Sequence, residues 1–361
     1  MKNTQAELWP INQLLIFMAA SSVIFMSLKF ASGLIVPFFI AASIAIVLSP
    51  ILDHLEKRHV PKIFSLIVII LLSLIPLAIL SGYIAGEAKD LANNFQSISQ
   101  KFTDNIQKFA QFMHGIGIDI DVSTLDEFFA NNNIGAIIKK LASQAGSQFS
   151  NIFLIFFTVA FMLMESGYFY NKMIKVAKEN GKDIAEWMDI IEKIKSYFLL
   201  KAKTSLLTAL WVLGVLWFYD VQYFYLWAAL AFFLNFIPVI GSILAAVPPV
   251  ILTFLDQSVV TALWVGLWYL VINIIVGNIL EPKIMGQGLK LSSLVIFLSM
   301  TFWGWVFGPT GMILSVPLTM ITQFLFSQYK ETRWIAFVLS DYQEKERIIH
   351  VAETEDTADD K

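Results

Sequence analysis

The 361-residue chain has no cysteine and little charge, and both absences restrict what it can be. Without cysteine, it has no disulfide framework, no thiolate metal ligand and no thiol nucleophile. Charged residues make up 15% of the sequence and hydrophobic residues 57%. In soluble domains, charged residues make up about 25% and hydrophobic residues about 45–50%. The composition therefore indicates an integral membrane protein, and the net charge of −3 gives no reason to expect a nucleic-acid partner.

Histidines and nucleotide-binding motifs are also scarce. No Gly-Lys-Ser or Gly-Lys-Thr sequence occurs, so ATP-driven transport by this chain is not indicated. The apolar runs contain no His/Ser/Asp set, which disfavours an intramembrane hydrolase, and we expect neither an enzyme nor a cofactor. No metal centre is expected inside the membrane, because all four histidines lie outside the apolar runs: His54, His59, His114 and His350.

Charge is missing most clearly from residues 204–280, where the only acids or bases are Asp220 and Asp256, both in predicted turns. A charged side chain at the centre of a bilayer is costly and usually functional. Amides offer hydrogen-bond donors and an acceptor without a full charge, which suits a neutral, hydroxyl-rich solute. Alternatively, such amides bridge neighbouring helices. The amides in this region are those of Asn235, Asn273 and Asn278.

Long apolar runs dominate the rest of the chain, and a spanning helix needs about 20 such residues. Together with two longer, interrupted runs, 222–255 and 292–327, they predict an all-α membrane protein of about eight transmembrane helices. The uninterrupted runs are 11–28, 33–51, 62–84, 149–164, 204–219 and 258–280.

The two interrupted runs are broken in similar ways. The first break is Pro238–Gly241 and the second is Gly308–Gly311. Each break contains a Pro and continues as Gly-x-Ile-Leu, and a Val-Pro pair follows that ends at Pro248 or Pro317. Backbone groups in lipid must find protein partners, so broken helices survive only against protein or a water-filled cavity. A matched pair of broken helices points to a transporter binding site.

Lys and Arg in the short loops predict the orientation of the spans. They concentrate in alternate loops, including eight lysines within 165–203, which places both termini in the cytoplasm. On this count the two broken hairpins point in opposite directions. The sequence therefore predicts an inverted repeat made of 204–255 and 258–327, which form the transport core.

The remaining segments flank this core. Residues 1–84 hold the N-terminal transmembrane helices, and 149–203 hold one span and a cytoplasmic helical loop whose lysines suit anionic lipid. The tail, 328–361, is acidic and expected to be disordered at its end. The polar segment 85–148 is an external insert with a first amphipathic pattern that ends near Gly115 and a weaker one after Ser123. We expect its helices to lie on the outer leaflet or to pack on a neighbouring subunit, either as plain packing or as a regulatory lid. The apolar positions of the first pattern are Leu91, Phe95, Ile98, Phe102, Ile106, Phe109 and Met113.

Two acids are candidates for coupling transport to proton or cation movement. Glu281 closes the last uninterrupted span and precedes Pro282, which biases Glu281 away from helical geometry. Alternatively, Glu281 is an interfacial acid paired with Lys283 or Lys290. Glu165, at the end of another span, is the second candidate. The aromatic side chain of Trp303, near the second break, either stacks on a substrate or packs against other side chains of the protein.

These motifs resemble the AI-2E family, whose members are known as autoinducer-2 exporters or PerM-like permeases. The resemblance covers nearly the whole chain except the external insert and the tail. It implies an oligomeric bacterial inner-membrane transporter, and it adds Gly286 to the candidate site. Where the family usually has Asp-Gly after the fourth span, this chain has Glu165-Ser-Gly167. The motifs are Leu234–Gly241, Gly277–Gly286, Leu291–Leu294, Phe302–Trp305, Gly308–Gly311 and Val316–Pro317, with Pro37-Phe-Phe-Ile and Ser49-Pro50 nearer the N-terminus.

The sequence thus predicts a secondary exporter of a small polar solute that operates by alternating access. The resemblance to the AI-2E family makes autoinducer-2 the best single candidate for the cargo. Efflux is driven either by the concentration gradient of the solute alone or by a coupling ion, H⁺ or Na⁺, and the resemblance implies a homo-oligomer. A Na⁺(Li⁺)/H⁺ antiporter is the first alternative, and a membrane scaffold or sensor that does not transport is the second. The predicted site lies between the two inverted halves and comprises Asn235, Pro238, Gly241, Asn273, Asn278, Glu281, Pro282, Gly286, Trp303, Gly308 and Gly311.

Overall fold

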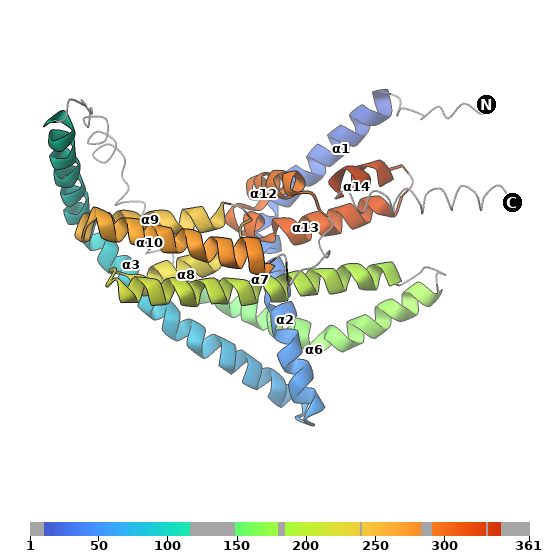
Figure 1. Cartoon of the computed structure of the whole chain (residues 1–361). Coiled ribbons are helices and arrows are strands. Elements are labelled where there is room, and N and C mark those ends of the chain that lie inside the picture. The colour runs from blue at the N-terminus through green and yellow to red at the C-terminus, as the bar shows by residue number, and fades with distance from the viewer. Residues whose placement is uncertain are drawn as a thin grey trace.

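The computed structural model describes residues 11–115, 149–179, 185–238, 240–281, 283, 291–329 and 331–340. Within these ranges the chain is helical and has no β-strand, which confirms the predicted all-α class. One isolated bridge joins Leu291 to Ser340. The helices are α1 Ile11–Phe30, α2 Ser32–Lys57, α3 Lys62–Gly115, α6 Phe149–Glu179, α7 Ala185–Phe218, α8 Phe224–Leu234, α9 Gly241–Asp256, α10 Val259–Asn273, η1 Ile274–Leu280, α12 Ser293–Phe307, α13 Pro309–Ser327 and α14 Arg333–Leu339 (Figure 1).

Several helices have the length and composition of membrane spans. Among the described residues five qualify on both criteria, and α8, α9 and α12 are apolar but shorter. This supports a multi-pass membrane protein, whereas the total of about eight spans stays a prediction. The five are Ser32–Lys57, Lys62–Asn94, Trp187–Phe218, Val259–Leu280 and Pro309–Ser327.

Two predicted boundaries lie within continuous helices. The span 62–84 continues without a break into the external insert as α3, and the span 204–219 is the second half of α7. No proline lies at either junction, so the backbone hydrogen bonding of the helix continues through it. The short helix α14, within the predicted tail, was not expected, and residues 341–361 lie outside the described part of the chain.

Both predicted helix breaks are present, and a glycine closes each one. The first separates α8 from α9, and the second separates α12 from α13 at Gly308. A Cβ atom placed on Gly241 would lie 1.8 Å from the carbonyl oxygen of Leu234. A Cβ atom on Gly311 would lie 1.9 Å from the carbonyl oxygen of Trp303. The two arms of each hairpin therefore meet at backbone contact, which only glycine permits.

The two hairpins belong to different buried clusters, and α7 contributes to both. Val212 and Leu216, in the second half of α7, join the cluster of α8, α9 and α10. Tyr197 and Phe198, in its first half, join the cluster of α12 and α13. Figure 1 shows α8, α9 and α10 gathered beside one end of α7, and α12, α13 and α14 toward the other. The helix α7 is thus the common support of both hairpins.

The first part of the external insert packs on its own chain. Leu91 and Ile98 of α3 are buried in the cluster of α8, α9 and α10. Lys101 Nζ lies 2.9 Å from Asp256 Oδ1 at the end of α9. The backbone N–H of Leu226 donates to the Glu87 carboxylate at 2.6 Å. At Leu91 and Ile98, therefore, the expected contact with the outer leaflet or a neighbouring subunit is wrong, because these side chains pack in the cluster of α8, α9 and α10. The weaker pattern after Ser123 lies outside the described residues.

Candidate functional site

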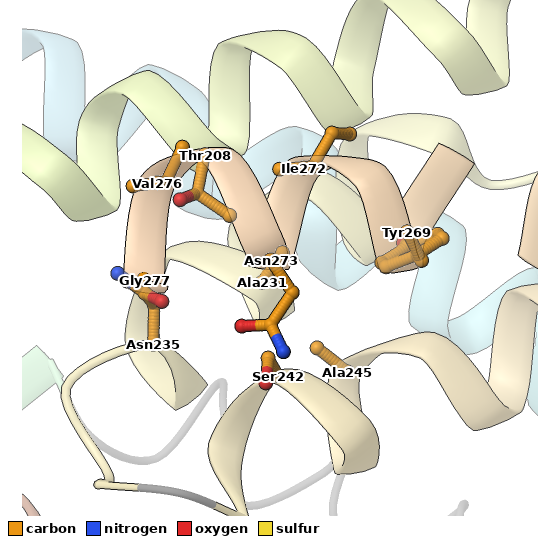
Figure 2. A pocket seen from close by; sticks show the side chains of 10 residues that line it. All are labelled: Thr208, Ala231, Asn235, Ser242, Ala245, Tyr269, Ile272, Asn273, Val276 and Gly277. Atoms are coloured by element: carbon orange, nitrogen blue, oxygen red, sulfur yellow. The ribbon is translucent and has the colours of Figure 1, made fainter. Parts of the chain in front are cut away.

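A small cavity lies where the first hairpin meets α7 and α10. It has room for about one water molecule. Alanine, isoleucine, valine and glycine residues form its apolar walls (Figure 2). Its polar lining contains no acid or base and consists of Thr208, Asn235, Ser242, Tyr269 and Asn273.

Asn235 lines this cavity from the position that directly follows α8. Its backbone N–H still bonds to the carbonyl of Ala231 at 3.0 Å, so the side chain keeps the direction set by the helix. The Asn235 amide donates to Ser205 Oγ on α7 at 3.0 Å. The predicted bridging role is therefore confirmed for Asn235, and the same residue lines the cavity.

Asn273 lies at the junction between α10 and the π-helix η1. Its Oδ1 is 3.2 Å from where a Cβ atom on Gly277 would lie, so Gly277 leaves room for the amide. Figure 2 shows the Asn273 amide directed toward Ser242 of α9. π-Helical turns are rare and occur frequently at functional sites. Asn278, five residues later, is exposed and does not line the cavity.

Two hydroxyl groups of the cavity lining have no hydrogen-bond partner. Thr208 Oγ1 and Tyr269 OH are both buried and unpaired. Leaving a buried polar group unpaired costs about 1–3 kcal/mol. Together with the amides, these hydroxyls form an uncharged set of donors and acceptors suited to a ligand that carries hydroxyl or carbonyl oxygens.

Glu281 lies one helical turn beyond the cavity and is paired. Its Oε1 lies 2.6 Å from Lys201 Nζ and accepts a hydrogen bond from Thr204 Oγ1 at 3.0 Å. The interfacial alternative named Lys283 or Lys290 as the partner, and the structure instead gives Lys201 of α7. Lys283 is exposed, and Lys290 lies outside the described residues.

The other predicted site residues lie away from this cavity or cannot be placed. Pro238 belongs to the non-helical turn between α8 and α9, which Gly241 closes. Trp303 is buried, donates to Thr319 Oγ1 at 3.0 Å and stacks on Phe307, so the packing interpretation is confirmed for it. Glu165 is exposed on α6. Pro282 and Gly286 lie outside the described residues.

Gly308 and Gly311 shape the second hairpin, and that hairpin contributes none of the residues that line the cavity. The expectation that both hairpins line one site therefore stays a prediction. Within the described residues, no group of three His, Asp or Glu side chains is placed to hold a metal ion.

Four residues of the site were not predicted. Thr208, Ser242, Tyr269 and Lys201 carry no strong local signal, since three are uncharged residues inside apolar runs and the fourth is one of eight loop lysines. One usable signal exists on α7. Polar residues repeat there at helical spacing, at Lys201, Thr204, Ser205 and Thr208, and mark one face of the helix.

Comparison with known proteins agrees with this architecture. The family model described as AI-2E family transporter matches residues 15–331. The AI-2 transport protein TqsA of Escherichia coli is 34% identical over 91% of this chain and 96% of its own length. A protein of Haemophilus influenzae, whose name refers to transport without stating a cargo, is 32% identical over 92% of this chain and 98% of its own.

A third relative, YhhT of Escherichia coli, is also named for transport without a stated cargo. It is 29% identical over 93% of this chain and 96% of its own length. The matches span the broken hairpins, the helix η1 and the support helix α7. The chain belongs to the AI-2E family of transporters.

Proposed function

We propose that this protein exports a small polar solute across the bacterial inner membrane, and that autoinducer-2 is its cargo. One observation supports the chemistry most directly. The cavity beside the helix break is uncharged and lined by amides and hydroxyls, two of which are buried without a partner. Autoinducer-2 is the cargo stated in the name of TqsA, which aligns over most of this chain. We further propose that both termini are cytoplasmic and that the protein is a homo-oligomer in contact with lipid.

The size of the cavity supports alternating access. The cavity has room for about one water molecule, and a solute the size of autoinducer-2 needs far more. In this conformation the site is closed around its polar groups, so the solute enters only after α9 or η1 moves away from α7. Movement of one repeat against the rest of the protein is the usual route in transporters with inverted repeats.

The test compares two asparagines that differ in where they point. Everted vesicles that contain the protein should accumulate autoinducer-2, because export from the cell is uptake into such vesicles. Asn273→Leu removes an amide that lines the cavity and should lower uptake at least tenfold, equivalent to about 1.4 kcal/mol. Asn278→Leu is the matched control, since Asn278 is exposed, and uptake should stay within about twofold of the original. Equal uptake by both variants would contradict the proposed site.

An Na⁺(Li⁺)/H⁺ antiporter is the second candidate, and the cavity size favours it. A dehydrated sodium ion occupies about the space of one water molecule, and neutral oxygens are suitable ligands for hard cations. In this alternative Glu281 carries the exchanged proton. Addition of Na⁺ or Li⁺ to everted vesicles with a preformed proton gradient should then collapse the gradient, and Glu281→Gln should prevent this. A gradient that persists after both additions would eliminate the antiporter.

A further inference from the structure

An interhelical ion pair lies within an interface that is otherwise built from uncharged side chains. Lys201 of α7 is 9% exposed, and its Nζ lies 2.6 Å from Glu281 Oε1 at the end of η1. The buried Thr204 donates to the same carboxylate oxygen at 3.0 Å. Two charges and a hydroxyl group thus join α7 to η1.

This ion pair lies directly next to the cavity in both helices. Thr204 is one turn from Thr208, and Glu281 is one turn from Gly277; both Thr208 and Gly277 line the cavity. Residues four apart lie on the same face of a helix. The ion pair therefore closes the α7–η1 interface one turn beyond the cavity, on the side where α10 continues into η1.

The backbone between the cavity and the ion pair is π-helical. The helix η1 runs from Ile274 to Leu280 with π-type bonding, directly between Asn273 and Glu281. A π-turn contains one residue more than an α-turn, so conversion to α-helix would rotate all that follows it. Such a rotation would carry the Glu281 carboxylate away from Lys201 and displace Gly277 from the cavity wall.

We propose that Lys201, Glu281 and Thr204 form a latch that holds the cavity closed at this end, and that Lys201 is a gating residue. The proposal rests on the proposed function insofar as the cavity is the solute site. The Lys201–Glu281 pair differs from the exposed pair of Lys193 and Asp189, which lies within α7 and joins no second helix. The latch predicts that loss of the interhelical pair exposes the cavity, whereas loss of the pair within α7 does not.

The absence of cysteine makes this test direct. Ser242→Cys puts a single thiol in the cavity wall, and its labelling by a sulfonated, membrane-impermeant maleimide reports access from one side of the membrane. Everted vesicles expose the face that the lysine-rich loop is predicted to occupy. With the latch intact, labelling should be slow. In Lys201→Met/Glu281→Gln, which leaves no unpaired buried charge, labelling should be at least about tenfold faster, equivalent to about 1.4 kcal/mol of lost closure energy.

Two further variants keep the test interpretable. Thr204→Val removes one hydrogen bond at nearly constant volume and should raise the labelling rate about threefold. Lys193→Met should leave the rate unchanged. The latch is wrong if the labelling rate rises in neither Thr204→Val nor the double variant while both variants elute and melt like the parent protein. If the double variant does not fold, the labelling rate of Thr204→Val decides.

The labelling test uses no cargo, so it fails or succeeds independently of the proposed function. Faster labelling in a protein that moves no autoinducer-2 would support the latch and contradict the cargo. Normal uptake of autoinducer-2, with unchanged labelling in Thr204→Val and in Lys201→Met/Glu281→Gln, would support the cargo and contradict the latch.

Discussion

The two broken hairpins share a backbone plan and differ in what fills it. In each, a glycine at the start of the second arm meets a carbonyl oxygen of the first arm, Gly241 with Leu234 and Gly311 with Trp303. The Cβ atoms of Ile237 and Phe307, each four positions before the glycine, also lie close to where a Cβ atom on that glycine would be. This likeness in contact geometry supports the internal repeat suggested by the two Gly-x-Ile-Leu sequences.

The difference lies at two equivalent positions. The residue after the contacted carbonyl is Asn235 in the first hairpin and Gly304 in the second. The residue after the closing glycine is Ser242 in the first and Met312 in the second. Asn235 and Ser242 line the cavity, whereas the Met312 side chain lies against Gly304, within 2.8 Å of where a Cβ atom there would lie. One hairpin therefore keeps a polar cavity where the other is filled by a thioether side chain.

The largest effect is expected from replacing the feature that both hairpins share, the glycine at the start of the second arm. Gly241→Ala and Gly311→Ala each place a Cβ atom within 2 Å of a backbone oxygen, which forces the arms apart. We expect each to lower the free energy of unfolding by about 3 kcal/mol, the upper end of typical overpacking, and the larger Leu variants to stop transport. Thermal melting of the detergent-solubilised protein measures this. Gly266→Ala is the control, since its nearest neighbour, Val250 Cγ2, would lie at 3.7 Å.

A second variant makes the first hairpin resemble the second. Ser242→Met introduces the residue found at the equivalent position and fills a cavity with space for about one water molecule. Uptake of autoinducer-2 by everted vesicles should fall at least about tenfold, a loss of about 1.4 kcal/mol in affinity or more. The thermal midpoint should fall less than that of Gly241→Ala. Unchanged uptake would show that solute does not pass this cavity.

The helix breaks could be predicted because their signals are local. Proline and glycine interrupt a helix wherever they occur in this arrangement, so Pro238–Gly241 and Gly308–Gly311 were visible in the sequence. The absence of charge from residues 204–280 likewise predicted an uncharged site. Both features depend on residue type and order alone, and the structure adds the distances.

Partners distant in sequence could not be predicted. Glu281 and Lys201 are 80 residues apart. The polar face of α7 that begins at Lys201 sets this lysine apart from the other seven of the 165–203 loop, but it does not name Glu281 as the partner. Asn273 and Asn278 looked equivalent for the same reason. Which of them faces α9 depends on how α10 and η1 pack and wind, and tertiary contacts determine this.

Gly308 distinguishes the hairpins by backbone conformation. Its φ of 67° and ψ of −152° belong to a region that L-residues rarely adopt, whereas Ile240, immediately before α9, has a φ of −89°. Gly308→Ala should cost about 1–3 kcal/mol of unfolding free energy through backbone strain alone, since no atom lies within 4 Å of its Cβ position. Gly214→Ala, in the last turns of α7 with equally open space, should cost nothing or stabilise slightly. Equal melting of both variants would contradict this assignment.

The smallest effect is expected where the second hairpin is made to resemble the first. Met312→Ser removes a half-buried thioether and leaves space beside Gly304, which should cost about 1–2 kcal/mol, below the range for fully buried methionine. Uptake of autoinducer-2 should stay within about threefold, because Met312 does not line the cavity. Combining Met312→Ser with Gly304→Asn supplies both polar residues of the first hairpin. A gain of uptake in that double variant would show that the two hairpins are alternative sites, and a loss as large as that of Ser242→Met would show that they line one path.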